Sequence, residues 1–414
     1  MKSIYLFFFL LFIIYLPVNS QVNNEDTKYS RKNIVKEFKN YYKTNNYSKA
    51  SDVINNAFSK FTETYDDYEF LLLAFNASYQ QYLQENRKFF LNNKGDTIVF
   101  FNHVLNSFKY GLRCDSLVNS TTINKKKKNK ISKEVLDKIF ALRLNLLSGG
   151  KFYLMKKKYD LAFSFFDLYM SSAQNRIFNK LQNEYFTIND DSISVAKLTV
   201  HSAYGCKKYR EVLRYLPLAI SDTTRREILL EIGSKSASIS QDTLCYYSLL
   251  HQGFNEYSDN EYFRTYLIQY YHNSNKYDDA IAVIDKCIEL DSLNTKYWKL
   301  KGNELLVQEK RDSAKSIFIH VVELDPYDFE TASILGNIYL KEAHEFYSSN
   351  NLIIDSPDYS KNRNTLVNLY NSAQKYFEIA YKLRPTQPEL WKEGLMEVYL
   401  KLNKGDELRK IESI

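Results

Sequence analysis

The residues of this 414-residue chain best suited to bind a metal ion or to move a proton near neutral pH are its histidines. No two of the six stand at the spacing that would put them on one face of a helix. His344-Glu345 begins the H-E-x-x-H pattern of zinc enzymes, but Ser348 stands where the second His is required. Asp355-Ser356-Pro357-Asp358 lacks the alternating oxygen ligands and the glycine of a calcium loop. We predict no metal site. The histidines are His103, His201, His251, His272, His320 and His344.

Motifs that activate a nucleophile or hold a nucleotide are missing from the sequence as well. It contains neither the G-x-x-x-x-G-K-[ST] phosphate loop nor the G-x-S-x-G elbow. Gly149-Gly150 is the one glycine pair, and a close crossing of two helices explains it as well as a phosphate would. We therefore predict no catalytic residue and no cofactor, so the chain is not expected to be an enzyme. An enzyme with a hidden site in residues 58–140 is the alternative.

Four cysteines offer no metal spacing either. Cys114, Cys206, Cys245 and Cys287 contain no C-x-x-C pair. We interpret Cys287 as a packing residue, and we leave open whether Cys206 and Cys245 form a disulfide. No disulfide is needed to explain the fold.

The charge distribution argues against a nucleic-acid partner. The net charge is +7, with 56 basic and 49 acidic residues. The one dense basic run, Lys125 to Lys130, has no interleaved aromatic residue or arginine and stands between two helical patterns. We predict that this run is a solvated loop.

The first residues have the pattern of an export signal. Lys2 precedes an apolar stretch of thirteen residues from Ile4 to Leu16, which Pro17 ends. A membrane span needs about 20 residues, so a cleaved signal peptide is favoured over a spanning helix. We predict residues 1–20 as a signal peptide cleaved near Ser20-Gln21, and hence a periplasmic or secreted protein. The alternative is a chain anchored by an uncleaved amino-terminal helix.

A 34-residue period organises most of the remaining chain. It is clearest from Thr295 to Asp328, where apolar, small and proline residues recur at defined places. Scarce glycine (11) and proline (6) also argue against a turn-rich β fold. The residues at positions 4, 8, 11, 20, 24 and 32 of this window are Trp298, Gly302, Leu305, Ala314, Phe318 and Pro326.

This pattern resembles the tetratricopeptide (TPR) family closely. The resemblance implies an all-α fold, a right-handed superhelical solenoid of antiparallel helix pairs. In each pair small residues lie where the helices come closest, here Gly302 and Ala314. Large residues such as Phe318 fill the space around that contact, and Pro326 ends the second helix.

The same phase extends in both directions. Earlier windows start at Glu261, Glu227 and Ile193, and Ala280 marks the second helix of the first of these. The following unit carries Gly336, but its Ala373, Phe377 and Pro385 come 25 residues later than the period requires. We predict four in-phase units over 193–328, then a unit over 329–387 with a loop insertion near 348–364, and capping helices over 388–414.

The amino-terminal half matches the pattern less well. Gly149-Gly150 followed by Tyr159-Asp160-Leu161-Ala162 indicates one repeat and a connection over 141–192. Residues 21–140 are predicted as diverged helical repeats. Tyr65 to Leu112 has a helical period without a fixed register, and Asn119 to Lys133 is predicted as a connection.

The resemblance also implies where a partner would bind. Stacked first helices of this family line a concave groove that takes a peptide or a partner helix. Lys299 with Asn303 is similar to the clamp by which some members hold a peptide carboxylate, although Ile334 stands where that clamp needs Asn. The predicted groove-facing residues are Tyr262, Gln269, His272, Lys296, Lys299, Asn303 and Asn337.

The function predicted from these features is a non-enzymatic protein–protein interaction scaffold of the cell envelope or periplasm. The partner would be a protein or peptide, with a membrane involved only if the amino-terminal segment stays attached. The alternative is a membrane-tethered structural subunit of an envelope assembly or secretion complex.

Overall fold

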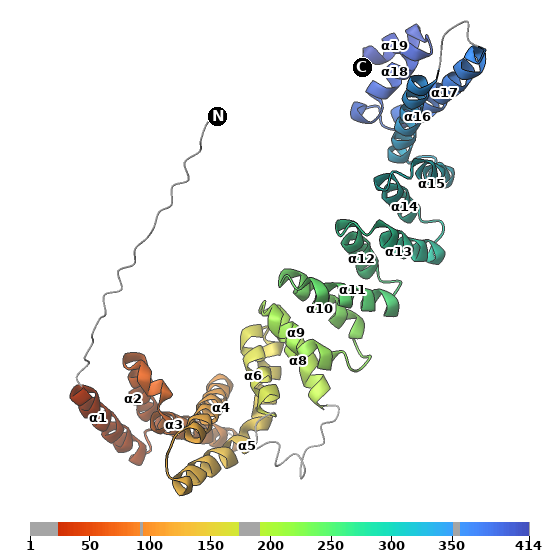
Figure 1. Cartoon of the computed structure of the whole chain (residues 1–414). Helices are drawn as coiled ribbons and strands as arrows, with labels where there is room; N and C mark the ends of the chain where they lie inside the picture. The colour runs from red at the N-terminus through yellow and green to blue at the C-terminus, as the bar shows by residue number, and fades with distance from the viewer. Residues whose placement is uncertain (1–23, 92–93, 174–190, 351–356, 414) are drawn as a thin grey trace, which may run out of the picture. The chain divides into compact units, whose positions relative to one another are not determined.

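The computed structural model describes residues 24–91, 94–173, 191–350 and 357–413 (Figure 1). Every α-helix in these ranges packs against the helix before or after it in the chain, and no β-strand occurs in them. The predicted all-α fold of antiparallel helix pairs is therefore confirmed. The chain divides into two compact units, residues 1–208 and 209–414, which are described separately below. The predicted signal peptide, residues 1–20, lies outside the described residues.

Unit 1 is built from pairs of helices of unequal length. α3 and α4 have 23 and 24 residues, whereas α2 has 14. The elements are α1 (Asn24–Lys43), α2 (Tyr47–Lys60), the 3₁₀ helix η1 (Thr62–Asp66), α3 (Tyr68–Phe90), α4 (Thr97–Ser120), α5 (Lys125–Met155), α6 (Tyr159–Ser172) and α8 (Asp191–Gly205).

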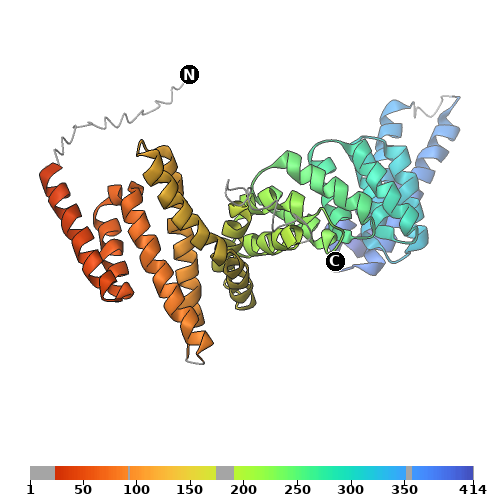
Figure 2. The ribbon, with the colours of Figure 1, turned by 90° about the horizontal axis from the view of Figure 1, so that it is seen from below.

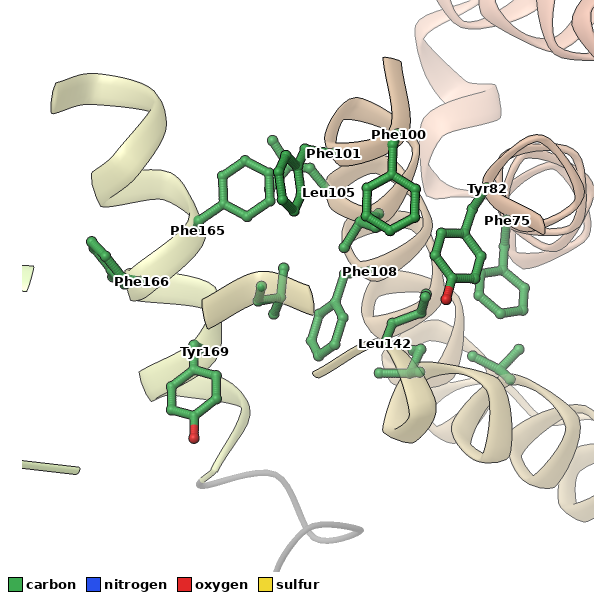
Figure 3. Close-up of a cluster of buried hydrophobic side chains, with 14 of the residues drawn as sticks. Phe75, Tyr82, Phe100, Phe101, Leu105, Phe108, Leu142, Phe165, Phe166 and Tyr169 are labelled. Carbon is green, nitrogen blue, oxygen red and sulfur yellow. The ribbon is translucent and has the colours of Figure 1, made fainter. Parts of the chain in front are cut away.

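The core of unit 1 is a continuous row of aromatic rings between α3, α4, α5 and α6 (Figure 3). Phe100 and Phe101 of α4 join the two ends of this row, because Phe100 contacts Tyr82 of α3 and Phe101 contacts Phe165 of α6. Phe165 is fully buried. Burying such rings supplies much of the free energy of folding of a helical unit, at about 25 cal/mol per Å² of apolar surface.

Glycine in α5 allows the helices of unit 1 to meet closely. A Cβ atom on Gly149 would lie 2.5 Å from the ring of Phe165, and one on Gly150 would lie 2.4 Å from the ring of Phe166. The glycine pair is therefore a site of helix–helix contact, as the packing interpretation predicted, and the interior of a helix leaves no room for a phosphate loop there.

The basic run of unit 1 corrects one prediction. Lys125 to Lys130 form the first turns of α5 and not a loop, and the only residues between α4 and α5 are 121–124. Asn124 caps the helix by accepting a hydrogen bond from the Lys126 backbone N–H at 2.8 Å. Lysine is also a good helix former. The helix therefore starts at the first lysine of the run, and the connection between the helices is shorter than the predicted Asn119–Lys133.

Unit 2 is a series of shorter helix pairs. Second helices of 14 residues recur, and first helices of 13 or 14. The elements are α9 (Tyr209–Ala219), α10 (Arg226–Ile239), α11 (Thr243–Glu256), α12 (Glu261–Asn273), α13 (Tyr277–Leu290), α14 (Thr295–Val307), α15 (Arg311–Leu324), α16 (Phe329–Ser349), α17 (Tyr359–Leu383), the 3₁₀ helix η2 (Pro388–Leu390), α18 (Lys392–Lys401) and α19 (Gly405–Glu412).

Backbone features of unit 2 repeat with the predicted period. Asn260, Asn294 and Asp328, each 34 residues apart, cap α12, α14 and α16 with a side-chain oxygen. The turn between the two helices of each pair holds a residue with positive φ, and these too are 34 residues apart: Gln241, Asn275 and Glu309. Lys207 of unit 1 continues the series. The 34-residue phase is thus visible in the backbone itself.

Glu309 is a costly residue for such a turn, since its φ is 61° and a side chain in the left-handed region is strained by about 1–2 kcal/mol. We expect Glu309→Gly to raise the free energy of unfolding by about 0.5–1 kcal/mol, because glycine adopts this conformation without strain. Gln308→Gly is the matched control. The φ of Gln308 is −81°, so this substitution should lower the free energy of unfolding. Urea titration of both variants checks the prediction. A gain in both, or in neither, would refute it.

The insertion near 348–364 also differs from the prediction in part. It lengthens the helices, because α16 runs to Ser349 and α17 begins at Tyr359, so 359–364 are helical and not loop. Residues 351–356 lie outside the described residues. The stacked rings of Tyr339 and Tyr376, with centroids 5.7 Å apart, join the two helices.

The capping segment is helical, as predicted. Trp391 precedes α18, is 1% exposed and donates its indole N–H to the Arg384 carbonyl at 2.9 Å. α19 buries Ile411 and exposes charged residues such as Asp406 and Arg409. A polar outer surface on the last helix keeps the end of a repeat array soluble.

Candidate partner-binding face

The first helices α12, α14 and α16 share one face of unit 2, which we call the first-helix face. It comprises the seven predicted side chains, which are Tyr262, Gln269 and His272 on α12, Lys296, Lys299 and Asn303 on α14, and Asn337 on α16. Ion pairs connect it across helices: Lys296 with Glu261 at 2.5 Å, and Lys299 with Asp328 at 2.8 Å. The seven predicted residues therefore come from three neighbouring first helices of one unit (Figure 1).

Lys299 is held in a partly buried ion pair. Its ammonium group contacts the Asp328 carboxylate at 2.8 Å and that of Glu330 at 3.6 Å, and the Asp328 side chain is only 5% exposed. Burial alone would raise the pKa of Asp328, but the hydrogen bonds from Lys299 and from the Thr331 backbone N–H lower it overall. The positive charge of Lys299 is thus neutralised within the chain, which weakens the similarity to a carboxylate clamp.

Lys299→Met is expected to lower the free energy of unfolding by about 1–2 kcal/mol, because it leaves the Asp328 carboxylate buried without its cation. Since the pKa of Asp328 is depressed in the folded state, the pair stabilises fully above the ordinary Asp pKa of about 3.9 and is lost as pH falls through the lower folded value. Urea titrations between pH 7 and pH 2 measure both effects.

The matched control for this pair is Lys296→Met. The Lys296 and Glu261 side chains are 50% and 71% exposed, so water already solvates both charges. A change of less than about 0.5 kcal/mol is expected there. Equal losses in the two variants would contradict the assignment of Asp328 as a buried partner.

His272 is engaged in a similar way. Its Nδ1 lies 2.9 Å from the carboxylate of Glu304, which is 5% exposed, while the imidazole is 47% exposed. Glu304 is a buried residue of a first helix. At the equivalent position of the next repeat, the buried residue is the apolar Ile338. The pair therefore ties α12 to α14 beneath the first-helix face.

The α12 end of the face is rich in tyrosine. The Tyr262 hydroxyl lies 2.9 Å from Ser234 Oγ, its ring centroid is 4.5 Å from that of Tyr266, and Lys235 Nζ lies 4.5 Å from it. Burial raises the pKa of Tyr262, so its hydroxyl stays protonated and available as a hydrogen-bond donor. Gln269, one helical turn beyond Tyr266, is exposed.

The α14–α16 end of the face contains a pocket of about 490 Å³. Its apolar part is formed by Leu306, Ile334 and Ile338, and its polar part includes the predicted residue Asn337. The remaining lining residues are Glu309, Arg311 and Lys341. An apolar floor with a few polar groups around it can accept one side chain of a bound peptide.

The predicted residues thus fall into two groups. Asn303, Asn337 and Gln269 are exposed and are joined to no other helix by the contacts of the described residues. The other four, Tyr262, His272, Lys296 and Lys299, form cross-helix contacts. Only the first group is free to meet a partner without breaking a contact inside unit 2.

In the part of the chain that the structure describes, no group of three or more His, Cys, Asp or Glu residues is placed to hold a metal ion. All four cysteine thiols are free, and burial raises the pKa of Cys114 to about 12, so that this thiol is protonated at neutral pH. None of the described helices is long and apolar enough to cross a membrane.

In two of the helix pairs, a glycine of the first helix meets a phenylalanine ring of the second helix. A Cβ atom on Gly302 would lie 2.6 Å from the ring of the fully buried Phe318, and one on Gly336 would lie 2.7 Å from the ring of Phe377. These are the predicted small-to-large contacts, in a backbone with a 34-residue phase. The spacing and the packing of these helix pairs resemble those of tetratricopeptide repeats. Pro326 and Pro385 follow the ends of α15 and α17, as predicted, and Ala280, Ala314 and Ala373 are fully buried.

Solved TPR structures resemble the chain at low sequence identity. The C-terminal part of a TPR repeat-containing protein from Cytophaga hutchinsonii is 14% identical, with a TM-score of 0.39 over 63% of this chain and 89% of that one. YrrB, described as a TPR protein with an unusual peptide-binding site, is 15% identical, with a TM-score of 0.29 over 50% and 97%. The P58(IPK) TPR domain is 15% identical, with a TM-score of 0.25 over 90% and 98%. No family model and no curated protein matches the sequence.

The buried carboxylates of Asp328 and Glu304 and most of the residues that line the pocket were not predicted from the sequence. Asp328 could have been found, because it continues the cap series of Asn260 and Asn294. Glu304 gives no such signal, since a lone Glu among helical residues is usually solvated. The pocket lies between α14 and α16 of two successive repeats, so no spacing within one repeat indicates it.

Proposed function

We propose that the protein is a non-enzymatic protein–protein interaction scaffold, and that the first-helix face of unit 2 binds a peptide or a partner helix. The observation that carries the proposal is the pocket between α14 and α16, whose lining includes the exposed amide of Asn337. Apolar anchors in a pocket with polar groups around them are the usual way in which an extended peptide gains affinity and orientation.

The two ends of the face suit different parts of such a partner. The tyrosines of α12 offer flat, amphipathic rings that give large contact area at small entropic cost. The pocket supplies a recess for one apolar side chain, and Lys341 at its edge favours a partner with an acidic residue close to that side chain. Arg311 contributes less charge, because it pairs with Glu345 at 2.5 Å.

Affinity capture from the envelope fraction of the source organism tests the proposal. Asn303→Arg with Asn337→Arg adds two bulky cations to the first-helix face without breaking a contact to another helix. We expect at least a tenfold loss of captured partner. Ala282→Arg with Ser313→Arg adds the same groups to exposed positions of the second helices and should leave capture unchanged. Equal capture by both double variants, or no specific protein with the wild type, would overturn the proposal.

Export of the chain belongs to the same proposal. It rests on the apolar stretch Ile4 to Leu16 behind Lys2 and on the small residues before Gln21. Sequencing the amino terminus of the protein isolated from its source distinguishes the possibilities. A start at Gln21 supports a cleaved signal, and a start at Met1 supports a tethered structural subunit.

A further inference from the structure

The tip of the α3–α4 hairpin in unit 1 carries a dense group of exposed apolar side chains. Phe90 is 80% exposed, Leu91 58%, Ile98 50% and Phe89 40%. Exposed apolar residues are common when scattered singly, but four large ones within a few residues of a helix end form a patch that water solvates poorly. None of them is required by the repeat pattern described above.

Contacts among the described residues of α3 and α4 hold the two flanks of this patch together. Glu85, 8% exposed, accepts a hydrogen bond from the Asp96 backbone N–H at 3.2 Å and thereby joins the two helices. Asp96 caps α4 by accepting from the backbone N–H groups of Ile98 and Val99. The ring of Phe89 packs edge-on against Phe100 and covers Gly95.

The charged side chains around the tip differ in whether they are paired. Glu85 is buried and pairs with Lys88, whereas the exposed Asp96 accepts hydrogen bonds from backbone N–H groups of the first turn of α4. Arg87 and Lys94 are exposed and form no ion pair among the contacts of the described residues. The outer surface of the tip is therefore apolar at its end and cationic beside it.

The projecting shape of the tip favours a bilayer surface over a protein as its partner. α3 and α4 are longer than α2 by 9 and 10 residues, and the hairpin projects beyond the adjacent ends of α1 and α2 (Figure 2). A projecting point can enter a soft, flat surface, whereas a protein partner for it would need a matching apolar recess. Apolar side chains that insert a few ångströms, with cations beside them, describe interfacial binding to an anionic bilayer.

We propose that the α3–α4 tip binds the surface of an anionic lipid bilayer. Phe90, Leu91 and Ile98 enter the boundary between headgroups and acyl chains, and Arg87 and Lys94 contact lipid phosphates. This places unit 1 at a membrane surface. The proposal does not depend on the identity of that partner.

A tryptophan placed at the tip reports on insertion in the full-length chain. Phe90→Trp keeps an aromatic ring at the most exposed tip position, and Leu244→Trp at an 83% exposed position of unit 2 is the matched control. Both variants retain Trp298 and Trp391. With vesicles of phosphatidylglycerol and brominated phosphatidylcholine, we expect a blue shift and at least twofold quenching of the added emission from position 90 only. The change should weaken several-fold with neutral vesicles or at high salt.

Two results would overturn the proposal. The first is no quenching at position 90, or equal quenching at positions 90 and 244. The second is a blue shift at position 90 without vesicles that grows with protein concentration, because this would assign the tip to a second copy of the chain. Failure of the capture experiment on unit 2 would leave the tip result intact.

Discussion

Phe318→Ala is expected to lower the free energy of local unfolding of the α14–α15 pair by about 3–5 kcal/mol, the usual cost of removing a buried aromatic ring. Phe318 is fully buried, and its ring fills the space that Gly302 leaves open between the two helices. Neighbouring helices cannot collapse into that space easily, because each is also packed against the next pair.

Hydrogen exchange of the backbone amides measures this effect locally, which suits a repeat array in which unfolding need not be two-state. A loss of about 3–5 kcal/mol corresponds to exchange in α14 and α15 that is faster by about two to four orders of magnitude. Tyr327→Ala, at a 77% exposed position of the next turn, serves as the control and should change little. Equal exchange in the two variants would show that Phe318 does not hold the pair together.

Gly150→Ala is expected to lower the free energy of unfolding of unit 1 by about 1–3 kcal/mol. A Cβ atom there would lie 2.4 Å from the fully buried ring of Phe166, which the surrounding aromatic core prevents from moving away. The clash outweighs the gain in helix propensity of about 1 kcal/mol that alanine normally gives over glycine.

Gly405→Ala is the matched control for this prediction. A Cβ atom on Gly405 meets nothing within 4 Å, and its φ is not positive. The same substitution is therefore expected to stabilise α19, by about 0.5–1 kcal/mol. Thermal unfolding followed by circular dichroism gives the sign of each change. Stabilisation by Gly150→Ala would show that the glycine pair is not a tight helix crossing.

The residues that could be predicted from the sequence are those that repeat. Gly302 with Phe318, and Gly336 with Phe377, lie in contact because a 34-residue pattern of small and large residues can only be satisfied by one pairing of helices. The same reasoning explains why the 25-residue displacement of Ala373 and Phe377 indicated an insertion, since their spacing to each other is unchanged.

What could not be predicted lacks a period. The α3–α4 hairpin has helices of 23 and 24 residues and the aromatic row described above in place of the small-residue signature, so its register stayed open. The lysine run was wrongly predicted as a loop because charge alone does not distinguish a solvated helix from a loop. Its capping residue, Asn124, was the available signal.

The candidate site was predictable in outline only. Helical positions placed the seven residues on three neighbouring first helices, but spacing within one helix cannot reveal a partner on the next. Lys299 therefore looked free, whereas it pairs with the buried Asp328, and His272 pairs with the buried Glu304. Such cross-helix pairs depend on how neighbouring repeats stack, which the sequence of a single repeat does not specify.

Site-specific photocrosslinking in cells of the source organism tests the central claim most directly. A photoreactive amino acid at Asn337, beside the pocket, is compared with one at Ala282 on the outer side of α13, both exposed. We predict a discrete crosslinked protein at position 337 that is absent at position 282. The same adducts at both positions, or none at position 337 while the chain is folded, would contradict a scaffold that binds its partner through the first-helix face.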